Sequence, residues 1–157
     1  LQLHLTQRQT KMRSSFILLL IGFSFGASAQ KLVSWNTFAQ VTFHRQYSET
    51  FGFEVNVKPP EFSPDLLALN GKEVKVKGYV IPVDIDLGMY MVSANPFANC
   101  FFCGNAGPET VVELIPTTKL PRFTTDQVVT FKGVLQINQQ GEMNAVPYQL
   151  FRAEVVK

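Results

Sequence analysis

The clearest pattern in the chain is an alternation of apolar and polar residues over residues 73–83, where valines alternate with lysines. Such a period of two is typical of a strand that buries one face. Gly78 interrupts the apolar positions and indicates a bulge or a sharp bend, as in a sheet that curls into a barrel. Residues 129–137 repeat the pattern, with Gly133 in the matching place. We therefore predict two bent strands.

Shorter apolar runs predict the remaining strands. Two of them, Met89–Ala94 and Thr110–Ile115, flank the cysteines, and a last strand follows Pro147. Ser63 and Pro64 predict a short helix, because a hydroxyl at the N-cap is followed by proline at the first helical position. Five main strands and one short helix predict a mostly β fold, a small OB-like, partly open antiparallel barrel. A β-sandwich of similar strand count is the alternative.

The N-terminal residues have the organisation of an export signal. Residues 12–29 hold a basic start, an apolar core and the small residues Ala27-Ser28-Ala29 before a cleavage point, as in a secretory signal peptide. The apolar run is too short for a stable membrane span. We therefore expect a periplasmic or secreted protein, with residues 1–11 as an unstructured upstream segment. Residues 30–60 are interpreted as an extension that packs on a barrel domain at 61–157.

Within that extension, Trp35, Phe38 and Val41 recur at three-residue spacing before the apolar positions begin to alternate. This change of period predicts a helical turn that leads into a strand. A second alternating run over residues 51–57 ends at Pro59-Pro60, since proline cannot donate to a strand ladder.

Removal of the predicted signal changes the charge balance. The whole chain has a formal net charge of +2, but residues 30–157 hold 11 basic and 12 acidic side chains. No run of basic residues is present in this part of the sequence. The composition therefore argues against nucleic acid and against an anionic membrane surface as the main partner.

Candidate chemistry is concentrated in one segment, which contains both cysteines as Cys100-Phe101-Phe102-Cys103. In an exported protein, two thiols at this spacing can form a local disulfide. They can instead supply two thiolates to a transition metal, zinc or copper. The third alternative is thiol–disulfide exchange, although the glycines that follow do not predict the helix that usually activates such a cysteine. The residues alone leave these three alternatives open.

A metal site would need further ligands. His44 is the only histidine after the predicted signal, and Glu109 and Glu113 are the nearest carboxylates. The candidate ligand set is therefore Cys100, Cys103, His44 and Glu109. Copper(I) would need fewer ligands than zinc and accepts two thiolates.

Three phenylalanines surround the thiols: Phe97, Phe101 and Phe102. We expect them to cap one end of the barrel, because large apolar side chains are usually buried. Their functional alternative is an apolar contact surface for a partner. No catalytic residues are assigned, since a single histidine does not define a triad.

Three further segments carry a resemblance. They are Leu69–Lys72, Gly78–Asp84 and above all Pro96–Glu109, which contains the motif Cys-Phe-Phe-Cys-Gly-Asn-Ala-Gly-Pro-Glu. In these segments the chain resembles an exported bacterial family of unknown function, especially its members from Bacteroidetes-like bacteria. The segment from Trp35 to Phe43 looks like the usual start of that family. The resemblance implies a periplasmic or secreted protein, in some cases associated with transport or metal-handling genes.

Together these patterns predict an exported small binding or accessory protein, leaning toward a non-enzyme. Its Cys100/Cys103 loop would bind a soft transition metal or form a local disulfide. The alternative is a thiol–disulfide redox protein. We expect a partner that is another exported or membrane-transport protein, with no nucleic acid and no stable membrane span after signal cleavage.

Overall fold

The computed structural model describes residues 30–140 and 146–156. The predicted upstream segment 1–11 and the signal peptide 12–29 lie outside the described residues. The described part is mostly β, as the alternating patterns predict. In chain order its elements are β1 Lys31–Val33, α1 Trp35–Phe38, β2 Val41–Ser48, β3 Phe53–Phe62, α2 Pro64–Leu67, β4 Glu73–Asp84, β5 Met89–Ser93, the 3₁₀ turns η1 Phe97–Asn99, η2 Phe101–Cys103 and η3 Pro108–Thr110, β6 Val111–Ile115, β7 Val128–Ile137 and β8 Tyr148–Val155.

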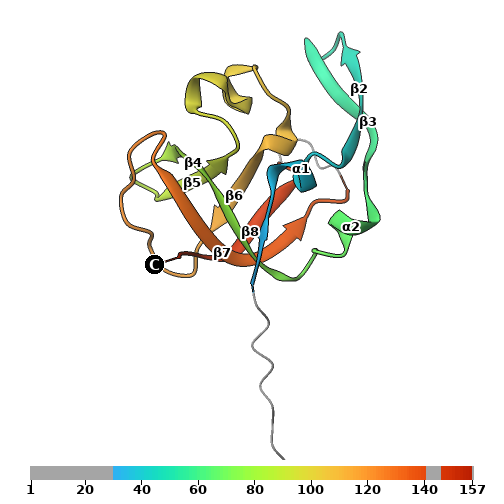
Figure 1. Cartoon of the computed structure of the whole chain (residues 1–157). Coiled ribbons are helices and arrows are strands. Elements are labelled where there is room, and N and C mark those ends of the chain that lie inside the picture. The colour runs from blue at the N-terminus through green and yellow to red at the C-terminus, as the bar shows by residue number, and fades with distance from the viewer. Residues whose placement is uncertain (1–29, 141–145, 157) are drawn as a thin grey trace, which may run out of the picture.

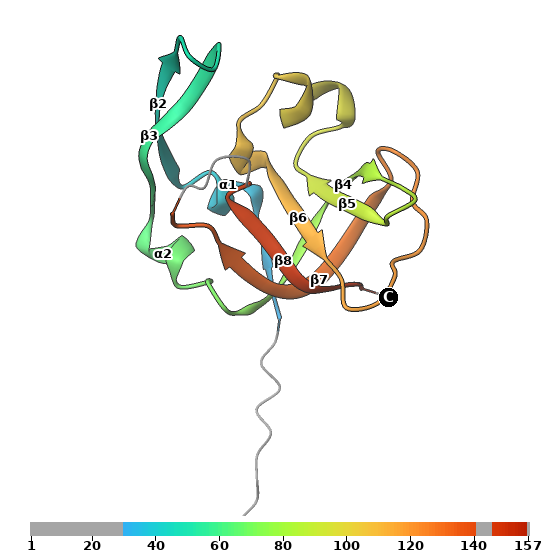
Figure 2. The same ribbon diagram turned by 180° about the vertical axis from the view of Figure 1, so that it is seen from behind.

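Five strands form a closed barrel in the order β4-β5-β6-β8-β7, and β7 returns to pair with β4. β4, the first strand of the barrel, lies between β5 and β7, which are its second and fourth strands. β6 runs parallel to β8, the fifth strand. This is the arrangement of an OB barrel. Figure 1 shows β7 crossing the front of the barrel, and Figure 2, seen from behind, shows β6 and β8 on the side that faces the viewer. The OB-like prediction is confirmed, with a ring that is closed where the sequence predicted a partly open one.

The two glycine-bearing strands are partners in this ring. In the antiparallel register of β4 and β7, Gly78 lies opposite Val129 and Gly133 lies opposite Val74. A Cβ at Gly78 would come within 2.3 Å of the Ser93 carbonyl oxygen, and one at Gly133 within 2.6 Å of the Phe151 carbonyl oxygen. The glycines are therefore required where the barrel curves so tightly that neighbouring backbone crosses these positions.

Apolar side chains from all five barrel strands fill the interior, as expected for a barrel of this size. Phe123, in the connection between β6 and β7, adds edge-to-face contacts with Tyr90 and Phe131 at ring-centroid distances of 5.2 and 5.6 Å. The buried strand residues are Val74, Val76, Val80, Tyr90, Val92, Val112, Leu114, Phe131, Leu135, Ile137, Tyr148, Leu150 and Ala153.

The start of the described chain is attached to the barrel. β1 pairs in parallel with β4, and the predicted helical turn is present as α1. Phe38 is fully buried with its ring 4.8 Å from that of Tyr148, whose hydroxyl donates to the Phe38 carbonyl oxygen at 2.6 Å. Burial, with a smaller effect of the Glu109 charge, raises the pKa of Tyr148 well above its usual range. The hydroxyl therefore stays a donor that ties α1 to β8.

The hairpin of β2 and β3 is a separate two-stranded sheet that projects away from the barrel in both views (Figures 1 and 2). The sequence predicted that the second strand ends at Pro59-Pro60, whereas β3 continues to Phe62. It can do so because β3 pairs only with β2, with register shifts beside the prolines. Proline is tolerated on such an edge strand, where no partner needs its missing N–H.

The short helix predicted at Ser63 is α2. The Ser63 hydroxyl accepts a hydrogen bond from the Leu66 amide at 3.2 Å, and Leu66 is buried in the core.

Candidate functional site

The cysteines lie in the long loop between β5 and β6, which consists of three short 3₁₀ turns. Gly104 ends η2 in the left-handed conformation with φ 74°, which suits a residue without a Cβ. The Asn105 side chain then donates to the Ala98 carbonyl oxygen at 3.0 Å and closes the loop on itself. We call residues 95–110 the cysteine loop.

An aspartate outside the loop holds its start in place. Asp126 accepts a hydrogen bond from the Phe97 amide at 2.6 Å, while its own amide donates to the Val80 carbonyl oxygen at 3.0 Å. Its φ of 64° is unusual for a residue other than glycine. The sequence analysis missed this residue, and the only available signal was its place in a Thr-Thr-Asp turn.

Cys100 and Cys103 are both free thiols, so the disulfide alternative is not formed in this structure. Cys100 is fully buried and Cys103 is exposed, with its sulfur 3.0 Å from the Phe97 carbonyl oxygen. Although Cys103 is exposed, partial desolvation raises the pKa of its thiol, and the charge and hydrogen bonding of the adjacent Cys100 add to this. The two thiols therefore form a close pair in which the raised pKa of Cys103 keeps that thiol protonated at neutral pH.

The structure does not bring the four candidate metal ligands together. His44 lies on the β2–β3 hairpin, where its Nε2 is 2.8 Å from a Glu61 carboxylate oxygen, and Figures 1 and 2 show this hairpin apart from the cysteine loop. Within the described ranges, no group of three or more His, Cys, Asp or Glu side chains could hold a metal ion. The predicted ligand set of Cys100, Cys103, His44 and Glu109 is therefore not assembled in this structure, where His44 is paired with Glu61 instead.

Glu109 has a different environment. It is the middle residue of η3, and its carboxylate folds back over Gly107, where an added Cβ would collide with it. The Glu109 charge also acts on buried Tyr148, where it adds to the rise in the pKa of that hydroxyl.

The phenylalanines do not cap the barrel as expected. Phe97 and Phe102 are 44% and 46% exposed, and none of the three belongs to the core cluster. Phe101 is partly buried against Phe102, with ring centroids 5.5 Å apart. In these 3₁₀ turns Cys100 is fully buried, whereas two of the three rings are open to solvent. The alternative of an apolar contact surface is thus the one that the exposure of these rings favours.

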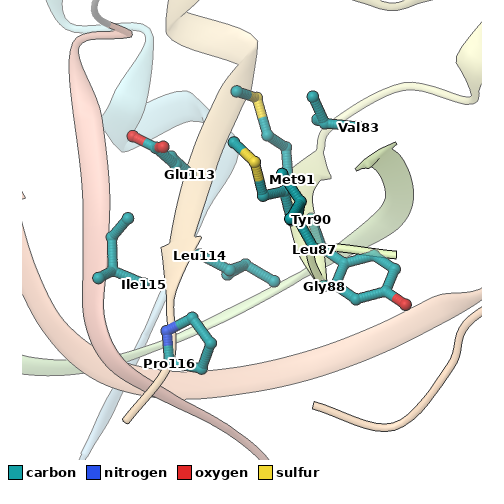
Figure 3. A pocket seen from close by; sticks show the side chains of 10 residues that line it. Val83, Leu87, Gly88, Tyr90, Met91, Glu113, Leu114, Ile115 and Pro116 are labelled. Carbon is teal, nitrogen blue, oxygen red and sulfur yellow. The ribbon is translucent and has the colours of Figure 1, made fainter. Parts of the chain in front are cut away.

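A second feature was missed by the sequence analysis. A cleft of about 300 Å³ lies against β5 and β6, beside the turn between β4 and β5 (Figure 3). The sequence pattern that could have indicated this cleft is a series of apolar residues at alternate positions, and the structure shows that their side chains are exposed. These residues are Val83, Ile85, Leu87 and Met89. The cleft is lined by Val83, Leu87, Gly88, Met89, Tyr90, Met91, Glu113, Leu114, Ile115 and Pro116.

No helix in the described part of the chain is long and apolar enough to cross a membrane. Comparison with protein-family models, with curated proteins and with solved structures found no match. The resemblance to an exported bacterial family therefore stays a prediction, and the chemistry of the site must be argued from its own residues.

Proposed function

We propose that this protein is an exported binding module that holds a soft metal ion, copper(I), between the sulfurs of Cys100 and Cys103. The observation that carries the proposal is the pair of free, adjacent thiols in the cysteine loop, one buried and one open to solvent. Soft thiolate ligands select copper(I), which needs fewer ligands than the closed tetrahedral site of structural zinc.

The raised pKa of Cys103 fits metal capture better than thiol–disulfide exchange. The attacking group in exchange is a thiolate, and reactive cysteines have a lowered pKa next to a helix N-terminus or a cation. The pKa of Cys103 is instead raised, and η2 has only the three residues Phe101–Cys103. A metal ion overcomes this protonation, because its binding displaces the thiol protons. The redox alternative is therefore the second candidate.

The surroundings of the thiols support the same proposal. The exposed rings of Phe97 and Phe102 provide an apolar rim beside Cys103. Such a rim limits water access to a bound ion and offers a contact surface for the partner that delivers or removes it. That partner would be another exported or membrane-transport protein, which the predicted signal peptide and the resemblance both favour.

The test is an anaerobic competition between residues 30–157 and a chromophoric copper(I) chelator. We expect one tightly bound equivalent, which the Cys100→Ser/Cys103→Ser variant loses. His44→Ala serves as the matched control and keeps it, since His44 is engaged by Glu61. Tight binding that survives the double cysteine change, or is lost in His44→Ala, would refute the site. A wild type that binds no copper but cycles between dithiol and disulfide would establish the redox alternative instead.

A further inference from the structure

We propose that Met89 and Met91 form a second soft-metal site, for copper(I) or silver(I), on the outer face of β5. This inference does not depend on the cysteine pair, because it rests on side chains of β5, whereas the cysteines lie in the loop that follows that strand. The two thioethers would act as ligands, and Glu113 on the neighbouring strand would balance the charge of a monovalent cation.

The strand geometry places the two thioethers together. Residues two apart on a strand project from the same face, and their Cα atoms are separated by about 7 Å. Met89 and Met91 both line the cleft beside β5 and β6. Methionine has three rotatable bonds, so two side chains at this spacing can direct their sulfurs at one ion. Figure 3 shows the Met91 side chain standing out from β5 into this cleft.

Core packing does not explain these methionines. The barrel interior is filled by the residues that alternate with them, Tyr90 and Val92, which are 2% and 0% exposed. Met89 is 44% exposed and Met91 is partly buried on the outside of the barrel. A pair of flexible, polarizable side chains is thus presented at the surface, where neither fills a gap in the core.

The walls of the cleft favour a soft ion over a hard one. Val83, Leu87 and Ile115 offer only apolar side chains, whereas Mg²⁺, Ca²⁺ and Zn²⁺ need oxygen, nitrogen or thiolate ligands. Thioethers bind copper(I), which resembles silver(I) in softness and charge. Glu113 is the one carboxylate among the lining residues, and a single carboxylate is too few ligands for a hard cation, so the walls favour a soft ion.

One carboxylate supplies the compensating charge. Glu113 is the directly opposed partner of Met91 in the β5–β6 register. Its Oε2 accepts a hydrogen bond from the Gln149 side chain at 2.7 Å, and Figure 3 shows the carboxylate turned away from Met91. Glu113 is thus fixed as a nearby negative charge and is not itself a ligand. Such a charge lowers the cost of placing a cation against an apolar wall.

The experiment follows methionine methyl groups by NMR in residues 30–157 labelled with ¹³C-methyl methionine. The Cys100→Ser/Cys103→Ser background removes the thiols, so the outcome is separate from that of the copper test above. This part of the sequence contains only three methionines, Met89, Met91 and Met143. On titration with silver(I), which is stable in air, we expect the Met89 and Met91 signals to shift together. The affinity should exceed that of free methionine by at least about 10²-fold, because two linked ligands act at a high effective concentration.

Matched variants complete the test. Met89→Leu and Met91→Leu conserve volume, and each should reduce the affinity to that of a single thioether. Met143→Leu should leave the titration unchanged, and zinc should shift neither signal. Equal shifts at all three methionines, a response to zinc, or an unaltered affinity in Met89→Leu would overturn the proposal.

Discussion

The two cysteines have the same chemistry but different environments. Cys100 lies at the junction of η1 and η2 and is fully buried, while Cys103, three residues later, is exposed and hydrogen-bonds to the Phe97 carbonyl oxygen. Partial desolvation and the neighbouring Cys100 thiol raise the pKa of Cys103. A raised thiol pKa means that the thiolate fraction is small at neutral pH and grows only as the pH approaches that pKa.

Alkylation of Cys103 by iodoacetamide should therefore be slow at neutral pH. We expect the rate to rise about tenfold per pH unit and to level off above the usual range for a thiol. Cys100→Ala removes the charge and hydrogen bond of the neighbouring thiol. The plot of alkylation rate against pH should therefore move to lower pH. Intact-mass measurement of the modified fraction against time gives the rates.

The matched control is Cys103→Ala, in which only buried Cys100 remains and modification should be much slower. An alkylation curve in Cys100→Ala that coincides with that of the wild type would show that the two thiols do not interact.

Among the elements, β4 has the largest effect on the architecture. Its first half pairs with β7 and its second half with β5, so this one strand closes the ring. Gly78 lies in the middle of that strand, close to the Ser93 carbonyl oxygen and to the ring of Trp35. The Trp35 indole N–H in turn donates to the Lys77 carbonyl oxygen at 2.9 Å. The bend in β4 therefore also positions the start of the chain.

Gly78→Ala should lower the free energy of unfolding by about 1–3 kcal/mol, the usual cost of adding a methyl group to a filled space. Two of the three nearest atoms belong to neighbouring side chains, but the closest is backbone and cannot move aside easily. Urea unfolding followed by the fluorescence of Trp35, the only tryptophan of the chain, measures the change.

Lys77→Ala on the same strand provides the comparison. Its side chain is exposed, so the change should stay within about 0.5 kcal/mol. Equal stability of Gly78→Ala and the wild type would mean that the strand does not need its glycine.

The whole molecule combines a closed barrel with one projecting hairpin. In the ring β4-β5-β6-β8-β7 every strand has a partner on both sides, and β1 adds to β4 from outside the ring. β1 begins at Lys31, one residue after the predicted cleavage point that follows Ala29. Cleavage there would leave every described strand complete, so the expected export signal and the fold are compatible.

Expression of the chain from Met12 in a host with a general secretion pathway should give a mature protein that begins at Gln30. Signal peptidase selects small residues before the cut, and Ala27 and Ala29 supply them. Intact-mass analysis of the periplasmic or culture fraction identifies the first residue. Ala29→Arg should block processing and leave the precursor in the membrane fraction. A protein that stays in the cytoplasm at full length would contradict both the signal peptide and the exported location.

Local patterns in the sequence determined much of this protein. The alternation around Gly78 and Gly133, the Ser63 cap and the spacing of the cysteines act over a few residues, so strands, a helix start and a thiol pair could be read from them. Five bent strands with this order of turns then favoured an OB-like barrel, because few folds accommodate them.

Only the tertiary structure decided which residues meet. The register of β4 with both β5 and β7 closes the ring, and the same pairings turn Met89 and Met91 outward. The hairpin keeps His44 with Glu61 and away from the cysteines, and the 3₁₀ turns bury Cys100 while Phe97 and Phe102 stay exposed. These outcomes depend on contacts between residues far apart in the chain, and neither composition nor periodicity encodes such contacts locally.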